Sequence, residues 1–159
     1  MNKVYVGKIT SFHGIKGELR IISEIDYADI ALKVGNTILI DNTEHVVKSY
    51  RKHKHYDMIT IDDYNNINDV LFLKNKKVYV DRKYLEGIKF IDQDLIGMKV
   101  IVNNEEKGYI KEIRKISSQK KLFVVEYKEK VVLVPYEFLK EVNIKDKKIV
   151  LESIEGLGL

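Results

Sequence analysis

The chain has no cysteine in its 159 residues, so it can form no disulfide, no thiolate nucleophile and no cysteine-ligated zinc site. It also lacks any apolar stretch close to the roughly 20 residues of a membrane-spanning helix. The first residues run directly into a β-branched segment and show no signal-peptide pattern. These absences predict a cytoplasmic protein in a reducing compartment, with no membrane partner.

Proline is nearly absent, since only Pro135 occurs, directly after the apolar residues 131–134. Because proline lacks a backbone N–H, we expect it to end that strand, with one helical turn over residues 136–140 after it. Hydrophobic residues make up 45% of the chain and are rich in Ile and Val, which favours sheet over helix bundle. The net charge of +4 permits RNA as a partner without requiring it.

Short segments rich in β-branched and aromatic residues recur through the first half of the chain, separated by turn signals. We expect strands over residues 4–10, 18–23, 37–40, 45–50, 58–61 and 77–80. This spacing is typical of an antiparallel barrel. Residues 67–74 differ because their apolar positions follow helical spacing, which predicts one short helix capped by Asn66 or Asn65 and stopped by Asn75.

Residues 85–93 contain Gly87 and mix polar with apolar side chains, as a connector between two packed units does. Beyond this connector, strands are expected over residues 98–102, 108–116, 122–127, 130–134 and 148–152. The second unit is therefore also predicted to be a small barrel or a rolled sheet. The predicted domains are residues 1–85 and 94–159, joined by a linker over residues 86–93.

A tight loop between the first two predicted strands carries Gly14 and Gly17 beside the cations His13, Lys16 and Arg20. Glycine at two such places indicates a sharp turn or a close backbone approach, because glycine alone enters positive φ without steric cost. The spacing does not suit a nucleotide-binding P-loop, which needs Gly-Lys-Ser/Thr at the start of a helix. The cations suit contact with phosphates such as those of RNA, so the pattern favours a binding surface over a catalytic one. The alternative is that the glycines only shape a turn, with Glu18 and Arg20 paired across strands.

The densest group of cations and aromatic rings lies between residues 48 and 56. Its cations are Lys48, Arg51, Lys52 and Lys54, and its rings are Tyr50, His53, His55 and Tyr56. Such a segment can place cations on phosphates and planar rings on exposed bases. We interpret it as a contact for RNA, with a solvated hairpin as the alternative.

No metal site, cofactor site or catalytic pair is predicted. His53 and His55 share one face of a strand but have no obvious third ligand, and Asp57 is equally expected to stay solvated. Adjacent carboxylates occur at residues 62–63 and 105–106. Neighbouring residues of a strand point to opposite faces, so these carboxylates cannot act together as acid and base, and we interpret them as solubilising charges in turns.

An apolar group at Phe90, Ile91 and Leu95 lies at the junction of the two units. Such a group can close the second barrel or dock a protein partner, because exposed apolar clusters near a domain junction often mark interfaces. Both interpretations stay open on these residues alone.

Several short motifs occur in a defined order along nearly the whole chain. The sequence Val-Gly-Lys-Ile at residues 6–9, with Gly7, precedes His-Gly-Ile-Lys-Gly-Glu-Leu-Arg at residues 13–20. Asp-Leu-Ile-Gly opens the second unit at residues 94–97, ending on Gly97, and later come Gly108 in a turn and Val-Leu-Val-Pro, ending on Pro135. In this combination the chain resembles the RimM family of ribosome maturation factors. Residues 70–80 resemble a further block of that family, with Val70, Leu71 and Asn75 departing from its pattern.

The resemblance implies a mainly β protein in which a six-stranded, translation-factor-like barrel is followed by a PRC-type barrel. It implies a non-enzymatic, monomeric factor that binds the immature small ribosomal subunit, assists assembly of its head and promotes 16S rRNA maturation. The implied protein partner is the nineteenth small-subunit ribosomal protein. The family contacts this partner partly through aromatic residues just before Asp-Leu-Ile-Gly, where this chain has Phe90 and Ile91.

Two other functions are weighed against this one. A general translation-associated adaptor that binds RNA or protein fits the same predicted folds, because a fold hosts many functions. A nuclease that trims rRNA would need a catalytic constellation, and the sequence shows no Ser-His-acid or paired ligand motif.

Overall fold

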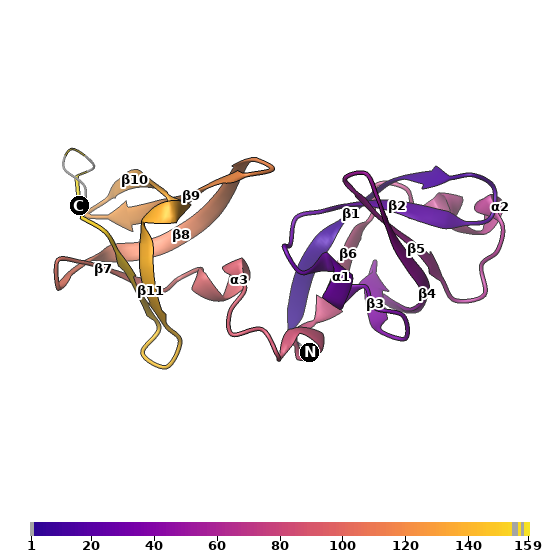
Figure 1. Ribbon diagram of the computed structural model, residues 1–159, viewed down its shortest axis with the longest axis horizontal. Helices are drawn as coiled ribbons and strands as arrows, with labels where there is room; N and C mark the ends of the chain where they lie inside the picture. The colour runs from indigo at the N-terminus through magenta and orange to yellow at the C-terminus, as the bar shows by residue number, and fades with distance from the viewer. Residues whose placement is uncertain (1, 154–155, 157) are drawn as a thin grey trace. The chain divides into compact units, whose positions relative to one another are not determined.

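The computed structural model describes residues 2–153, 156 and 158–159, and it divides into two compact units (Figure 1). The first unit runs to Lys89 and the second begins at Phe90. None of the helices in the described part of the chain has the length and apolar character needed to cross a bilayer.

Six antiparallel strands form a closed barrel in the first unit, in the order β1-β2-β5-β4-β3-β6. Their bounds are β1 Lys3–His13, β2 Glu18–Ser23, β3 Thr37–Ile40, β4 Thr43–His53, β5 Tyr56–Ile61 and β6 Lys77–Asp81. The prediction of a six-stranded barrel here is confirmed. The translation-factor-like character that the resemblance implies stays a prediction.

Alternation of side chains explains why these segments close into a barrel. On β2, Leu19 and Ile21 are fully buried, while the residues between and beside them are partly exposed. Leu19 faces Ile59 of β5 across the hydrogen-bonded ladder, so both contribute to the core inside the barrel. Because side chains alternate with a period of two, the residues between them lie on the outer face of the same strands.

Short helices lie between the strands of the first unit and after its last strand. The predicted helix is present as α2 Ile67–Val70, continued by the 3-10 turn η1 Leu71–Leu73. Asn66 caps it by accepting a hydrogen bond from the Asn68 N–H at 2.9 Å, and Asn75 follows it with φ of 68°. Two further short helices were not predicted, α1 Ala28–Ala31 and η2 Arg82–Leu85.

The second unit is a six-stranded sheet in the order β10-β9-β8-β7-β12-β11. Its strands are β7 Lys99–Val102, β8 Glu105–Ser117, β9 Lys120–Tyr127, β10 Lys130–Pro135, β11 Leu139–Asn143 and β12 Lys148–Leu151. Strands β7 and β12 pair in parallel and the other neighbours are antiparallel. Pro135 ends β10 as predicted, whereas closure into a PRC-type barrel stays a prediction.

Two elements of the second unit differ from expectation. Helix α3 Asp92–Leu95 begins inside the segment predicted to be a linker, and β11 begins where the predicted helical turn should still continue. Asp92 binds Lys121 at 2.6 Å and the Tyr136 hydroxyl at 2.9 Å, which are partners distant in sequence. Local pattern alone could not reveal contacts of this range. The turn itself is η3 Tyr136–Phe138, shorter than predicted.

Two of the motif glycines lie where strands shift register and backbones approach closely. A Cβ built on Gly7 would overlap the Ile22 carbonyl oxygen, and one built on Gly108 would overlap the Glu126 carbonyl oxygen. Gly108 also has φ of 85°, a conformation that costs an L-residue additional strain. Both positions therefore exclude any side chain for a steric reason.

Replacing Gly108 by Ala is expected to lower the free energy of unfolding of the second unit by at least about 2 kcal/mol, because the added methyl meets backbone atoms. Urea unfolding followed by circular dichroism measures the change. The matched control is Gly87→Ala, since a Cβ on Gly87 meets nothing within 4 Å. Equal stabilities of the two variants would contradict the steric explanation.

A candidate nucleic-acid interface on the first unit

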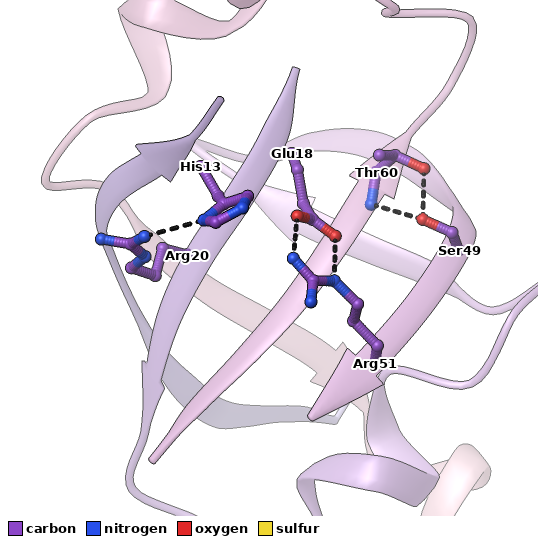
Figure 2. Close-up of polar contacts among 6 residues, drawn as sticks. All are labelled: His13, Glu18, Arg20, Ser49, Arg51 and Thr60. Atoms are coloured by element: carbon purple, nitrogen blue, oxygen red, sulfur yellow. Dashed lines mark hydrogen bonds and ion pairs between the residues drawn. The ribbon is translucent and has the colours of Figure 1, made fainter. Parts of the chain in front are cut away.

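The outer face of strands β1, β2, β5 and β4 gathers the charged residues of two distant sequence segments. His13 lies opposite Glu18 in the β1–β2 ladder, and both Arg20 and Arg51 lie opposite Met58 of β5. Residues directly opposite in antiparallel strands point to the same face. The predicted loop residues and the predicted hairpin residues therefore share one surface (Figure 2).

Arg51 reaches across β5 and holds Glu18 with a two-pronged contact. Its Nη2 donates to Oε1 at 2.7 Å and its Nε donates to Oε2 at 2.8 Å. These hydrogen bonds hold the pKa of Glu18 below its usual range, although burial acts in the opposite direction. Two of the Arg51 donors are thus committed to Glu18, which leaves a fixed, ionised carboxylate on the surface.

Arg20 and His13 form a second pair on this face. The Arg20 Nη2 lies 3.0 Å from the His13 Nδ1, and its guanidinium lies 5.2 Å from the centre of the Tyr56 ring. Because arginine only donates, His13 accepts through an unprotonated Nδ1. The Glu18–Arg20 pair considered from the sequence is wrong, since each residue has another partner. The buried Arg20 Nε has no hydrogen-bond partner.

His53 of β4 lies beside this pair, with its ring centre 5.8 Å from that of His13. Desolvation lowers the pKa of His53, and the nearby Arg51 and Lys54 charges lower it further. The side chain therefore stays uncharged at neutral pH, as a planar ring on a cationic surface.

The glycine loop is fastened to the start of α2. Gly14 and Gly17 have φ of 66° and 85°, as their predicted role in a sharp turn requires. The Ile15 carbonyl accepts a hydrogen bond from the Ile67 N–H at 2.8 Å. This arrangement holds Lys16 exposed at the tip of the loop.

A pocket of about 400 Å³ opens between this loop and the sheet. Its lining residues are His13, Gly14, Ile15, Lys16, Glu18 and Thr60. Ile15 is 75% exposed and supplies an apolar edge, whereas Glu18 supplies an acceptor.

The cations of the β4–β5 hairpin, at residues 48–54, are of two kinds. Lys48 and Lys54 are exposed, with Lys54 at the β4–β5 turn. Lys52 lies 3.3 Å from Asp57, which is 1% exposed and also accepts from the Ser23 hydroxyl at 2.6 Å. The expectation that Asp57 stays solvated is therefore wrong, because the barrel end buries it among donors.

The chain is similar in sequence to known proteins along nearly its whole length. The family model described as the RimM N-terminal domain matches residues 4–85. The ribosome maturation factor RimM of Staphylococcus aureus strain MRSA252 is 34% identical over 166 aligned positions, covering 98% of each chain. The chain belongs to the RimM family. The RimM of strain JH9 of that organism shows the same identity and coverage.

Two solved RimM structures are less similar. A 16S ribosomal RNA processing protein RimM from Pseudomonas aeruginosa is 19% identical, with a TM-score of 0.47 over 96% of this chain and 98% of that one. The N-terminal domain of Thermus thermophilus RimM is 15% identical, with a TM-score of 0.46 over 54% of this chain and 95% of that domain. Because both TM-scores are low, membership of the RimM family rests on the sequence matches.

In this RimM-family chain, the three apolar residues predicted to contact a ribosomal protein differ in exposure. Leu95 is fully buried in the core of the second unit and Ile91 is 4% exposed. Neither side chain can serve as a surface contact in this structure, because its apolar area is already covered. Phe90 packs against the same core as Leu95 but is only partly buried.

A further pair was missed in the sequence. Asp62, interpreted as a solubilising turn charge, accepts the Val46 N–H at 2.8 Å and lies 2.6 Å from the Nδ1 of His45, which is 5% exposed. Asp62 therefore lies in a turn as interpreted, but its carboxylate binds His45 and the Val46 N–H and is not simply a solubilising charge. His45 lies on β4 and Asp62 lies in the turn after β5, so no local pattern links them. Among the described residues, no group of three metal-ligating side chains could hold an ion.

Arg51→Ala is expected to raise the pKa of Glu18 towards its usual value, because the hydrogen bonds that favour the carboxylate are lost. Since the folded-state pKa lies below the unfolded one, this contact stabilises the unit above the usual pKa of Glu. That contribution is lost as the pH falls through the folded-state pKa. NMR titration of the Glu18 carboxyl carbon measures it, with Lys48→Ala on the same strand as control. An unchanged Glu18 titration in Arg51→Ala would contradict the assignment.

Proposed function

We propose that this protein is a non-enzymatic accessory factor for late assembly of the small ribosomal subunit, at its head, and that it promotes 16S rRNA maturation in the cytoplasm. One observation carries the proposal: the chain matches curated ribosome maturation factors along nearly its full length. The outer face of the first unit adds support, because it presents cations suited to RNA phosphates.

In this proposal the first unit contacts RNA. Lys16, Lys48 and Lys54 are exposed on the loop and hairpin, and the neighbouring rings of His13 and His53 add planar surface to the same unit. Cations of this kind contribute affinity that declines with salt, and rings can stack on unpaired bases. Arg51 and Lys52 contribute less directly, because each already has a carboxylate partner.

The second unit, proposed to be a PRC-type barrel, contacts the nineteenth small-subunit ribosomal protein. Phe90 is the residue proposed for this contact. It precedes α3, which Asp92 fastens to the sheet through Lys121 and Tyr136. An aromatic side chain on a firmly held segment loses little entropy on binding, which suits an interface anchor.

The factor acts by differential affinity and performs no bond chemistry. A protein that binds an assembly intermediate more tightly than the finished subunit stabilises the intermediate and dissociates as mature contacts form. Sedimentation of cell extract tests this proposal: the protein should travel with immature small subunits and be depleted from mature ribosomes. Equal association with mature ribosomes would indicate a general translation adaptor, and magnesium-dependent cleavage of rRNA by the pure protein would indicate a nuclease.

Replacing Lys48, Arg51, Lys52 and Lys54 together by Ala should weaken association with immature subunits and make its salt dependence shallower, because fewer phosphate contacts form. Binding is measured by filter retention across a salt titration. The matched control replaces four exposed lysines of the second unit by Ala, namely Lys111, Lys115, Lys140 and Lys145. This control variant loses the same number of positive charges. Identical salt slopes for both variants would argue against phosphate contact by the hairpin.

Phe90→Ala should weaken binding of the nineteenth ribosomal protein by about tenfold or more, the cost of losing an aromatic interface anchor. Calorimetric titration measures the affinity. Phe138→Ala is the control, because Phe138 also packs partly buried against the core of the second unit. A folded Phe90→Ala protein that binds with wild-type affinity would remove Phe90 from the interface.

A further inference from the structure

The outer face of β1 and β6 carries a pair of tyrosines. Tyr5 of β1 lies directly opposite Tyr79 of β6, with ring centres 5.4 Å apart and ring planes tilted by 55°. The residues on either side of each tyrosine are buried valines, so by alternation both rings lie on the outer face, where they are partly exposed. Aromatic rings side by side on a sheet are the kind of platform on which nucleic-acid bases stack.

Three exposed lysines surround this pair. The Lys77 Nζ lies 5.9 Å from the centre of the Tyr5 ring, and the Lys3 Nζ lies 6.0 Å from that of Tyr79. Lys8 lies opposite Lys77 in the same ladder, so cations stand at both ends of the pair along the strands. Contacts near 6 Å are at the outer limit of a cation–π interaction, so a base can displace these lysines from the rings. We call these five residues the tyrosine face.

Two acidic side chains lie close to the tyrosine face but do not cancel its charge. Asp81, opposite Lys3, already accepts the Lys83 N–H at 3.0 Å. Burial raises the pKa of Tyr5, and the charge of nearby Glu24 raises it further. The Tyr5 hydroxyl is therefore neutral and does not repel a phosphate. The three lysines outnumber these two acids.

The surroundings of the rings decide between a protein and a nucleic acid as the occupant. The core of a protein interface is apolar and depleted of charge. Leu39, opposite Tyr79 on β3, is 7% exposed and adds little apolar surface. Ile22 is more exposed but lies opposite Lys8, at a charged end of the face. Rings with cations at both ends suit a strand in which flat bases are joined by phosphates.

We propose that the tyrosine face binds single-stranded RNA, with a base stacked on each ring and phosphates held by the three lysines. One base cannot lie flat on both rings, because their planes are tilted by 55°, so each ring takes a base of its own. Every base has a flat face, so binding of this kind tolerates many sequences.

This surface is separate from the proposed RNA contact of the β4–β5 hairpin and goes beyond it. In the closed barrel β1 and β6 are neighbours, and β2 on one side and β3 on the other separate them from β5 and β4. The two surfaces therefore lie on opposite sides of the first unit. A barrel with a contact on each side can hold two RNA segments near one another. The inference rests on the proposed function only for the source of the RNA.

Stacking is measured with the full chain and a uridine-rich RNA that carries one 2-aminopurine, whose fluorescence falls when the base stacks. Binding should quench the fluorescence, and the ring-proton NMR signals of Tyr5 and Tyr79 should move upfield, whereas those of Tyr127 should not. Tyr127 of the second unit is a suitable comparison, because Lys107 and Lys128 lie 5.3 and 5.1 Å from its ring centre but the residue opposite it is a lysine. Unshifted Tyr5 and Tyr79 signals, or no quenching at low salt, would overturn the proposal.

Replacing one ring tests its share of the affinity. Tyr79→Leu keeps an apolar side chain and should weaken RNA binding about fivefold or more, as the loss of one stacked base does. Tyr79→Phe keeps the ring and should bind as the unchanged protein does. Tyr127→Leu is the matched control and should leave the affinity unchanged. A folded Tyr79→Leu protein with full affinity, or an equal loss in Tyr127→Leu, would reject stacking on this face.

Further variants separate the tyrosine face from the hairpin and from a protein partner. The variant that lacks the four hairpin cations should still quench 2-aminopurine, and loss of quenching there would assign the RNA to the hairpin. Lys8→Ala with Lys77→Ala should make the logarithmic salt slope shallower by about 1.4, because each phosphate contact of a single strand contributes about 0.7. An unchanged slope would argue against phosphates at this face.

A Tyr79→Leu protein that keeps its affinity for RNA but loses that for the nineteenth ribosomal protein would identify a protein as the occupant. Sedimentation of the unchanged protein with immature subunits decides the proposed function separately.

Discussion

The contact between Arg51 and Glu18 organises the outer face of the first unit. It joins β4 to β2 across the intervening β5, which carries no charge at the crossing point because Met58 lies there. Arg51 was predicted to contact RNA, but two of its nitrogens already donate to Glu18. The same contact holds the Glu18 carboxylate in one orientation. Desolvation, helped by the nearby Arg51 charge, lowers the pKa of His53 on the same surface. A surface that looks uniformly basic in the sequence therefore includes a carboxylate that neutralises one of its arginines.

The end of the same barrel shows a related division of charge. Asp57 is buried and accepts from Ser23 and from the Tyr50 hydroxyl at 2.5 Å, and Lys52 supplies the compensating charge. Burial and the contact with Asp57 raise the pKa of Tyr50 above its usual range, so its hydroxyl stays a donor to this carboxylate. A buried carboxylate is tolerated only where donors surround it. Lys52 and Tyr50 thus stabilise the fold, while Lys48 and Lys54 remain directed to solvent.

In the second unit, one carboxylate of α3 joins the start of the unit to β9 and to the turn after β10. Asp92 binds Lys121 and Tyr136, and the Tyr136 ring stacks on the buried Phe123 with centres 4.7 Å apart. Polar and aromatic contacts therefore act together to hold α3. This explains why residues that resemble a linker in sequence form a helix, and why Leu95 belongs to the core.

The sequence by itself determined most of the strands, the short helix after Asn66, the sharp glycine loop and membership of the RimM family. These features depend on local periodicity, on turn chemistry and on short motifs, all of which are written in neighbouring residues. Only the tertiary structure decided the partners of Glu18, Asp57, Asp62 and Asp92, the burial of Ile91 and Leu95, and the strand β11. Each of these depends on strand register or on contacts between distant segments. The charge of a side chain is readable from the sequence, but the groups that neutralise it are set by which strands the folded chain places side by side.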